Sequence, residues 1–477
     1  MTAFEKIAIF LALTPALTIT LMSSTQGDII NMQKQKHFDW ILLVILLSYF
    51  MILLDNSIIF TGTVKIAQDL HLDQNTLSWV SSAYSLTFGG FLLVGGRAGD
   101  LFGRRRVFQI GLIIFGLGSL LVGAAGSATL IIAARAFQGI GSAILAPTTL
   151  AILMDTYTGG KRVRAIGYYG AMGGIGASVG LVIGGLLASL LSWRIGFFIN
   201  VPIAVWMLYL SMRHLPNDTG RKGTLDWLGT LTSLFGMITL VYSIVGTVGQ
   251  LYALIAAVIL LGIFIAQEAH TAQPIMPLRL FADLERTGAN ISHILYMGAM
   301  LGFWFITPQI MQSQLGFTPL MAGIAFFPLT VVNFVVALQV ARLTKKLGNG
   351  GLLIIGILLT FIGMFWMSRF TPATGYWLGI ALPMVMLGVG QGLALSPFTA
   401  AGVAHTLGED AGAASGVVNV MHQLGGSIGL SILVAIQGMF RGVVPGFQHA
   451  ILTGAWLLFL ALLAAIFMVL PGERRNH

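Results

Sequence analysis

Long apolar runs separated by short polar or charged segments make up this 477-residue chain from Trp40 onward. A run of about 20 mostly apolar residues is long enough to cross the hydrocarbon core of a bilayer as a helix. The pattern predicts fourteen such helices, at residues 40–64, 77–96, 107–126, 129–153, 163–188, 195–213, 224–246, 250–268, 288–311, 319–342, 351–369, 376–400, 412–438 and 448–470. We therefore expect an all-α polytopic membrane protein.

Residues 1–38 are expected to form an N-terminal extension. The apolar run at 7–22 contains Pro15 and is short for a membrane span. A signal-peptide interpretation rests on Lys6 ahead of this run and on small residues after it. We favour a dispensable extension, because the segment that starts at Met32 is typical of a basic N-terminus directly before a first span.

Composition excludes several classes of protein. Hydrophobic residues make up 56% of the chain and charged residues only 9%, with a mean hydropathy of +0.90. A soluble domain has about a quarter charged residues. The net charge of +9 does not indicate nucleic-acid binding, because the basic residues lie in short clusters between apolar runs rather than on one face. We expect a membrane protein with no nucleic-acid partner.

The sequence also argues against a cofactor or an enzyme. The chain has no cysteine, which excludes disulfides and thiolate metal sites. The nine histidines lack metal-ligand spacing, and His293 and His422 are interpreted as isolated polar groups. Gly160-Lys161 is no phosphate loop, so no nucleotide is expected. No predicted span presents a nucleophile and base together, so we expect neither metal, cofactor nor catalysis.

The basic residues predict the topology. Lys and Arg near the ends of spans are retained on the cytoplasmic side. With an even number of spans, one side would hold most of these residues, and the other side only Lys65, Arg194, Arg369 and Arg441. We therefore expect both ends of the fourteen-helix core to be cytoplasmic.

Residues 96–107 are predicted to form a charged turn between the second and third spans. They read Gly-Arg-Ala-Gly-Asp-Leu-Phe-Gly-Arg-Arg-Arg-Val. Gly99 and Gly103 flank Asp100 and suit a tight reversal where two helix ends approach closely. On charge alone, a generic basic cytoplasmic loop is the simpler interpretation.

A weak internal repeat indicates two related halves. Residues 341–348 follow the tenth span as residues 96–103 follow the second, and Gly348 aligns with Gly103. Repeated halves around a central site are common in transporters. The predicted division is an N-terminal six-helix bundle at 39–215, two inserted transmembrane helices at 216–282 and a C-terminal six-helix bundle at 283–477.

Asp55 and Arg135 stand out as ionisable residues inside predicted spans. Such groups are costly in a membrane and are functional candidates by default. Counted at 1.5 Å per residue from the span ends, both lie roughly 10 Å below the outer face and are able to share one cavity. We expect Asp55 to bind and release a proton while Arg135 responds to its charge. The alternatives are a fixed structural ion pair, or an arginine bound to backbone carbonyls.

Other candidates are small or polar residues within spans. A face of small residues on the fifth span suits close helix packing. Its glycines are Gly176, Gly180, Gly184 and Gly185. Four polar residues are candidates for lining a substrate cavity: Gln138, Gln309, Asn333 and His422.

Taken together, these stretches resemble the major facilitator superfamily, and within it the fourteen-helix drug:proton antiporter family. The match covers nearly all of residues 35–470. Residues 96–106 look like the loop between helices two and three, and residues 135–143 like the helix-four motif assigned to proton coupling. Residues 54–59 look like the acidic motif of helix one, and residues 192–202 like the segment that opens helix six.

The resemblance implies the major facilitator fold, with two six-helix bundles and two inserted helices, in a bacterial inner or cell membrane. It further implies an interdomain charge latch that is made and broken as the transporter rocks. The latch residues would be Gly96, Arg97, Asp100, Gly103, Arg104 and Arg105. The glycines of the fifth span correspond to the family's antiporter motif.

The chain departs from the family pattern at three places. Leu181 stands where the antiporter motif of helix five has a proline, so a built-in kink is absent. Phe60 and Val64 replace the Asn and Pro that usually follow the acidic residue of helix one. His422 stands where helix thirteen frequently has an arginine.

We expect a proton-coupled efflux transporter that exports lipophilic small molecules by alternating access. Its partners would be the substrate, protons and the lipid bilayer, and a monomer is the default. The nearest alternative is a dedicated exporter of one endogenous metabolite, such as a siderophore or a lipid precursor, on the same scaffold. A non-transporting receptor or scaffold is disfavoured, because it has no need of buried charges such as Asp55 and Arg135.

Overall fold

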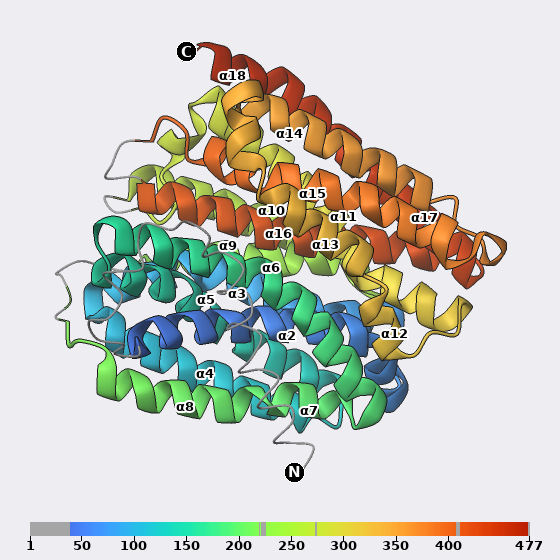
Figure 1. Cartoon of the computed structure of the whole chain (residues 1–477), viewed down its shortest axis with the longest axis horizontal. Coiled ribbons are helices and arrows are strands. Elements are labelled where there is room, and N and C mark those ends of the chain that lie inside the picture. Colours follow the sequence, from blue (N-terminus) through green and yellow to red (C-terminus); the bar gives the residue numbers. More distant parts are fainter. Residues whose placement is uncertain (1–38, 219, 221–225, 272–273, 407–410, 476–477) are drawn as a thin grey trace, which may run out of the picture. The chain divides into compact units, whose positions relative to one another are not determined.

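The computed structural model describes residues 39–475 apart from residue 219 and segments 221–225, 272–273 and 407–410, so the predicted N-terminal extension lies outside the described residues. Within this part of the chain every regular element is a helix and no β-strand occurs. The elements, seen in Figure 1, are α2 (Trp40–Leu70), α3 (Gln74–Phe102), α4 (Arg104–Gly123), α5 (Ala128–Thr156), α6 (Gly159–Leu190), α7 (Trp193–Phe198), α8 (Asn200–His214), α9 (Trp227–Val245), α10 (Gln250–His270), the 3₁₀ turn η2 (Leu278–Phe281), α11 (Leu284–Gln314), α12 (Pro319–Ile324), α13 (Phe327–Ala337), α14 (Val340–Met367), the 3₁₀ turn η3 (Pro372–Thr374), the π-helical turn η4 (Trp377–Ala381), α15 (Leu382–Gly402), α16 (Ala411–Met439), α17 (Val443–Ala464), the π-helical turn η6 (Ala465–Val469) and α18 (Leu470–Arg475).

The helices confirm the predicted membrane class. In the described residues thirteen helical segments are long and apolar enough to cross a bilayer. Some of these segments combine consecutive helices, as in Trp193–His214, which contains α7 and α8. The 32-residue helix α6 covers the remaining predicted span, 163–188, and its described apolar stretch is Val179–Leu190.

The N-terminal helices pack around α5. This helix lies against both α3 and α4, and α4 also contacts α7 and α8. Small residues let the backbones approach closely. A Cβ atom at Gly118 of α4, for example, would come within 2.7 Å of the Cα atom of Gln138 on α5. The helices that carry the candidate ionisable residues are therefore held tightly together.

The C-terminal helices form a second set of neighbours. Helix α11 contacts α16 and α17, while α15 packs against α13 and α14. The main contacts between the N-terminal helices α2–α8 and the C-terminal helices α11–α18 are those of α3 with α16 and of α6 with α12, and α6 also touches α13.

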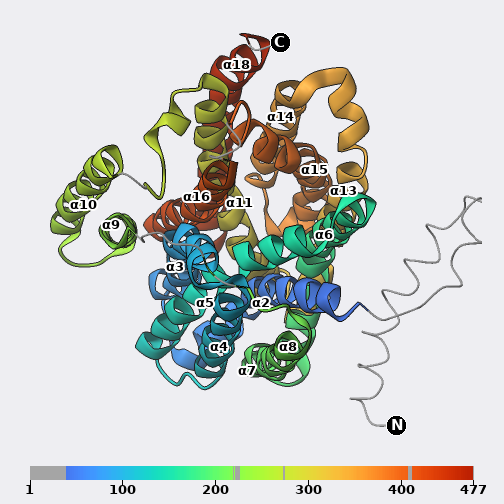
Figure 2. The same cartoon turned by 90° about the vertical axis from the view of Figure 1, so that its left-hand side faces the viewer.

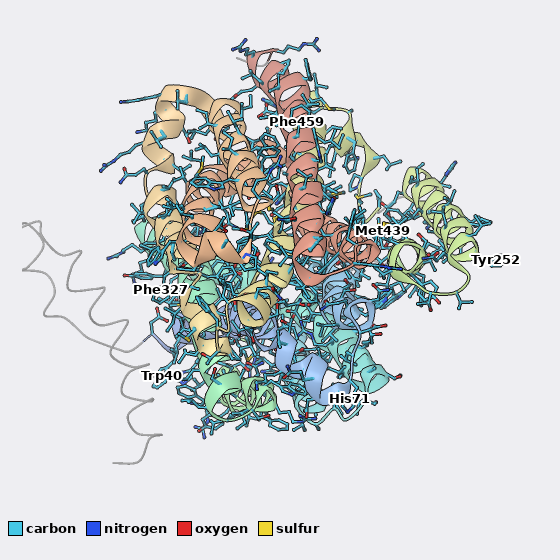
Figure 3. All side chains as sticks on the ribbon, turned by 90° about the vertical axis from the view of Figure 1, so that its right-hand side faces the viewer. Trp40, His71, Tyr252, Phe327, Met439 and Phe459 are labelled. Atoms are coloured by element: carbon cyan, nitrogen blue, oxygen red, sulfur yellow. The ribbon has the colours of Figure 1, made fainter. Side chains whose placement is uncertain are left out.

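Helices α9 and α10 form the inserted pair. Figure 2 shows α10 on the outer side of α9. Helix α9 also contacts α3 and α16, whereas most of α10 is exposed. Tyr252 of α10 is 79% exposed and, like Phe327 of α13, points outward in Figure 3. Exposed apolar side chains of this kind suit a surface in contact with lipid.

Two predicted boundaries differ from the structure. The predicted tenth span, 319–342, is two helices, α12 and α13. Pro328, at the start of α13, explains the break, because proline lacks an N–H and does not fit a helix interior. The charged turn at 96–107 is also shorter than expected, since α3 continues to Phe102 and only Gly103, with φ +93°, separates it from α4.

Candidate functional site

Asp55 and Arg135 form an ion pair in the interior of the N-terminal helices. Arg135 Nη1 lies 2.6 Å from Asp55 Oδ2. The Asp55 side chain is 0% exposed and that of Arg135 is 1% exposed. The sequence placed these residues at one depth, and the structure places them in direct contact between α2 and α5. They are enclosed by other side chains rather than lining an open cavity.

Two amide side chains complete the surroundings of the Asp55 carboxylate. Gln138 Nε2 donates to Asp55 Oδ1 at 2.8 Å, and Asn200 Nδ2 donates to the same oxygen at 3.0 Å. Gln138 also accepts a hydrogen bond from Arg135 Nη1 at 2.7 Å. The hydroxyl of Ser119 accepts from both amides, at 2.7 Å from Gln138 and 3.4 Å from Asn200. All five residues are buried.

Helix α3 holds the Arg135 guanidinium from the other side. Its Nε donates to the carbonyl of Val80 at 3.1 Å, and its Cζ lies 4.1 Å from the centre of the Tyr84 ring. A guanidinium stacked on an aromatic face is stabilised by the negative face of the ring. The Tyr84 hydroxyl is 2.7 Å from Ser142 Oγ, which holds the ring in place.

This arrangement suits an ionised carboxylate. The hydrogen bonds to Asp55 come from donor groups, and the charge of Arg135 balances the negative charge in a site of low polarity. The remaining partners of Arg135 are Gln138, the carbonyl of Val80 and the Tyr84 ring, and none of them is charged. The ion pair and its two amides therefore join α2, α5 and α8 around one buried carboxylate.

The charged turn binds neighbouring helices of the N-terminal group. Arg104 pairs with Asp100 at 3.1 Å and with Asp155, and it donates to the carbonyl of Ala151 at 3.1 Å. Asp155 and Ala151 lie in the last turns of α5, where a cation is favoured by the helix dipole. Arg97 is exposed in the last turns of α3, and Gly96 beside it faces Pro147 of α5. The role of these residues as an interdomain latch stays a prediction.

Arg105 joins α4 to the end of α8. It donates to the carbonyls of Met212 and Leu215, at 2.7 and 2.9 Å, and to Asn217 Oδ1 at 2.5 Å. Asp218, just beyond, accepts hydrogen bonds from the backbone N–H groups of Arg104 and Arg105, at 2.5 and 3.2 Å. A carboxylate in this position caps the start of α4. Residues after α8 thus anchor the charged turn.

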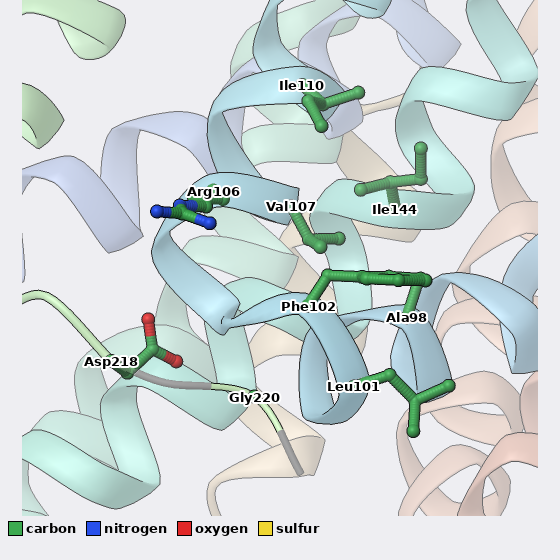
Figure 4. A pocket seen from close by; sticks show the side chains of 9 residues that line it. All are labelled: Ala98, Leu101, Phe102, Arg106, Val107, Ile110, Ile144, Asp218 and Gly220. Carbon is green, nitrogen blue, oxygen red and sulfur yellow. The ribbon is translucent and has the colours of Figure 1, made fainter. Parts of the chain in front are cut away.

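Asp218 also borders a hollow of about 580 Å³ beside this turn. Figure 4 shows Asp218 and Arg106 on one side of the hollow and the apolar side chains of Phe102, Ile110 and Ile144 on the other. Phe102 and Ile110 are exposed. The hollow therefore lies on the outside of α3–α5, not at the ion pair.

The predicted repeat has a structural counterpart to this cap in the C-terminal helices. Gly348 has a φ of +73° and interrupts α14, as Gly103 separates α3 from α4. Glu473 of α18 accepts hydrogen bonds from the N–H groups of Asn349 and Gly350, each at 2.9 Å. In each set of helices a carboxylate after the last long helix therefore caps the helix that follows a positive-φ glycine.

The glycine face of α6 meets two different helices. Cβ atoms at Gly176, Gly180 and Gly184 would lie within 3 Å of atoms of α2, the helix that carries Asp55. A Cβ atom at Gly185 would instead lie 2.5 Å from the carbonyl oxygen of Pro319 on α12. The face therefore packs both on the ion-pair helix and on the C-terminal helices.

The four polar cavity candidates have separate partners. Gln138 belongs to the ion-pair network, Asn333 Nδ2 lies 3.4 Å from Gln391 Oε1, and His422 meets His293. Gln309 accepts a hydrogen bond from Gln74 at 3.0 Å. This last pair borders a cavity of about 410 Å³ between α2, α3, α11 and α16. The structure does not bring the four residues together.

Sequence reasoning missed several members of the site. Asn200 lies inside the stretch 192–202 that was singled out, but no role was assigned to it. Ser119 and Tyr84 are ordinary residues of apolar spans and carry no signal of their own. Asp218 and Glu473 lie beyond predicted spans, where a carboxylate is usually a solvated surface group. Only the packing of the helices identifies them.

Comparisons with known proteins agree with the fold and the motifs. The sequence model of the Major Facilitator Superfamily matches residues 45–430. Puromycin resistance protein pur8 of Streptomyces alboniger is 35% identical, over 83% of this chain and 81% of its own length. Cephamycin export protein CmcT of Amycolatopsis lactamdurans is 32% identical, over 90% of this chain and 92% of its own length.

Solved structures show the same fold at low sequence identity. The nucleoside transporter NupG is similar with a TM-score of 0.66 and 14% identity, over 90% of this chain and 99% of that chain. A bacterial homologue of the human lysosomal transporter Spinster gives the same TM-score with 15% identity, over 90% of this chain and 97% of that chain. With the helical architecture and the family match over most of its length, this chain belongs to the Major Facilitator Superfamily and is a multi-pass membrane transporter.

Proposed function

We propose that this transporter exports lipophilic small molecules in exchange for protons. The observation that carries the proposal is the fully buried Asp55–Arg135 pair, with amide donors placed around the carboxylate. The free energy of a buried carboxylate depends far more strongly on its charge than that of an exposed carboxylate does, so gain or loss of a proton there has a large effect. The printed names of two relatives, a puromycin resistance protein and a cephamycin export protein, support efflux of drug-like compounds.

The contacts between the two sets of helices support alternating access. They include the Gln74–Gln309 bond and a hydrogen bond of 3.4 Å from Gln312 Nε2 to the carbonyl of Thr61. The Leu320 N–H also donates to Ser189 Oγ at 2.9 Å. These contacts lie near the helix ends opposite the charged turn, which we call the far end. We propose that the far end faces outward, that it is closed in this conformation and that it opens to release substrate.

Asn200 is proposed to serve both protonation states of Asp55. Its Nδ2 donates to the carboxylate, while its buried Oδ1 has no hydrogen-bond partner among the described residues. A protonated Asp55 needs an acceptor for its O–H, and rotation of the Asn200 amide turns Oδ1 toward it. Asn200 would then hold the charged form through its nitrogen and the neutral form through its oxygen.

Replacing Asn200 with alanine is expected to slow proton-coupled efflux by about tenfold or more, because a hydrogen bond to a charged group contributes roughly 1.5–3 kcal/mol. Initial rates of efflux from proteoliposomes measure this effect. The matched control is Asn419→Ala, since Asn419 is exposed on α16 and donates to the carbonyl of Ser415. Equal rates for Asn200→Ala and the wild type would exclude the proposed role.

The proposed function is tested with purified protein in liposomes that contain a pH-sensitive dye. Puromycin, other lipophilic cations and lipophilic anions are added under an imposed pH gradient, and proton movement is recorded. We expect saturable, substrate-triggered proton flux in the presence of several unrelated lipophilic compounds. Proton flux with only a single compound class would favour a dedicated metabolite exporter. Transport without proton movement would overturn the antiport assignment.

A further inference from the structure

Two histidine side chains meet between α11, α15 and α16, on helices other than those of the Asp55 pair. The ring of His293 on α11 stacks on Phe398 of α15, with centroids 4.7 Å apart and planes 11° apart. The ring of His422 on α16 meets the His293 ring at 90°, with centroids 5.3 Å apart. The three helices are neighbours, as Figure 1 shows. The sequence treated these histidines as isolated, but tertiary packing pairs them.

His293 is buried with its polar atoms unused. Its side chain is 4% exposed, and neither Nδ1 nor Nε2 has a hydrogen-bond partner among the described residues. A neutral imidazole has one N–H donor and one acceptor nitrogen, and buried groups of this kind are nearly always bonded. So little exposure closes the ring off from solute molecules outside the protein. A proton is the ligand that needs no open space beside the ring.

The three helices that form the site carry few other charges. On the helices that form the site, the remaining titratable residues are Glu285, Arg286 and Tyr296 on α11, none on α15, and none besides His422 on α16. The Arg286 guanidinium donates to the carbonyls of Leu280 and Ala404, and the Tyr296 hydroxyl is 3.3 Å from Thr360. A positive charge on the histidine pair would therefore be stabilised by the Phe398 ring face and by the second imidazole.

We infer that the His293–His422 pair is a second proton-binding site, which takes up one proton between its two rings. The proton binds to a nitrogen lone pair of one ring, and the resulting N–H donates to a nitrogen lone pair of the other after a rotation of the side chains. Two imidazolium ions this close would repel each other, so the pair accepts one charge rather than two. This site is distinct from the coupling proposed for Asp55.

The N-terminal helices place a different ring pair at the corresponding position. Tyr49 is the tenth residue of α2, as His293 is of α11, and both helices have 31 residues. The Tyr49 ring stacks on Tyr169 of α6 with centroids 4.1 Å apart. A phenol that keeps its proton has no strongly basic atom, whereas a neutral imidazole has a basic nitrogen lone pair that accepts a proton. Only the pair on the C-terminal helices is therefore suited to proton uptake.

A polar side chain lies between this pair and the start of α11. Asn290, 4% exposed and close to one turn from His293, has an Oδ1 atom without a partner among the described residues. Its Nδ2 donates to the carbonyl of Arg286 at 3.0 Å. Arg286, Asn290 and His293 lie on one face of α11. This face supplies a route for the proton from the end of α11 that carries Arg286.

The direct test uses magic-angle-spinning NMR of protein with ¹⁵N-labelled histidine in liposomes, titrated between about pH 5 and pH 8. His293→Gln and His422→Gln spectra assign the two rings, and His449→Gln is the control, since His449 is only partly buried and stacks on Phe440. We expect both rings to change together, with one proton gained by the pair. If the two rings stay neutral, or if they titrate independently, the inference is overturned, and this result does not depend on whether the protein transports substrate.

A second experiment, which rests on the proposed antiport, asks whether this proton is coupled to substrate. Protons exchanged on addition of puromycin are counted with a pH indicator for purified Asp55→Asn protein. We expect a measurable exchange in Asp55→Asn that does not exceed one proton per puromycin bound, and none in Asp55→Asn/His293→Gln. Exchange in the wild type but none in Asp55→Asn would overturn coupling at the histidines and leave the proposed function intact. No exchange in the wild type would instead contradict the proposed function, while the NMR titration still decides on the site.

Discussion

Replacing Asp55 with asparagine is expected to abolish proton-driven uphill efflux while the chain still inserts and folds. Asparagine keeps the shape of aspartate, but its amide side chain does not take up or release a proton as a carboxyl group does. Loss of an essential proton-transfer group lowers activity by about two orders of magnitude or more. Efflux against a gradient in proteoliposomes, with proton flux recorded in parallel, measures the effect.

The variant also removes the counter-charge of a buried arginine. Arg135 is 1% exposed and contacts Asp55 at 2.6 Å, and breaking a buried ion pair costs roughly 3–5 kcal/mol. Part of this cost is offset, because the asparagine oxygen still accepts from Arg135 while the amides of Gln138 and Asn200 are able to rotate. Size-exclusion chromatography and thermal unfolding in detergent report whether the fold survives.

A double variant separates coupling from stability. Asp55→Asn/Arg135→Gln removes both charges and leaves no unpaired buried ion, so we expect it to unfold at a higher temperature than Asp55→Asn. Its proton-driven efflux should still be absent. If the folded double variant pumps against a gradient as the wild type does, the ion pair is a fixed structural element, as the alternative interpretation of the sequence holds.

Substituting Gly185 with alanine is expected to weaken closure of the far end. The added methyl group would lie 2.5 Å from the carbonyl oxygen of Pro319 and 2.9 Å from the Cα atom of Leu320, both backbone atoms of α12. Helices α6 and α12 must separate to admit it. Overpacking of this kind costs typically 1–3 kcal/mol, which corresponds to about a 5–150-fold shift between two conformations. We expect the rate of efflux to fall in proportion to the population of the closed conformation.

Spin labels on introduced cysteines measure this shift directly, because the chain has no cysteine of its own. Suitable sites are Leu190 at the end of α6 and Trp377 at the start of η4, which are 69% and 72% exposed. Gly185→Ala should add a population with a longer distance between the labels. The control is Gly167→Ala on the same helix, where nothing lies within 4 Å of the added Cβ atom. An unchanged distance distribution would show that the α6–α12 contact does not control closure.

The sequence motifs located the segments of the chain that form the site. They did not predict which other residues contact Asp55 and Arg135. Asp55 and Arg135 were identifiable because a charge within an apolar span is rare and costly. Their contact with Asn200 was not, since that residue lies 145 positions from Asp55 and an asparagine carries no distinctive signal. For the same reason the isolated appearance of His293 and His422 in the sequence concealed their contact.

The charged turn illustrates a similar limit. Its arginines were visible as a cluster, but their partners at the ends of α5 and α8 depend on how three helix ends meet. The expected interdomain role rested on the family resemblance. The partners described for Arg104 and Arg105 belong to the N-terminal helices.

The amino-acid sequence by itself determined the membrane class, the all-helical architecture and most helix positions, because each helix satisfies its own backbone hydrogen bonds and needs only a long apolar run to cross a bilayer. It also identified Asp55 and Arg135 as charged residues within apolar spans. Tertiary structure decided which polar groups meet: the amides around Asp55, the carboxylate caps at Asp218 and Glu473, the histidine pair and the glycine contact at Gly185. These contacts join residues far apart in the chain, and they depend on the side-by-side packing of helices that hydropathy does not specify.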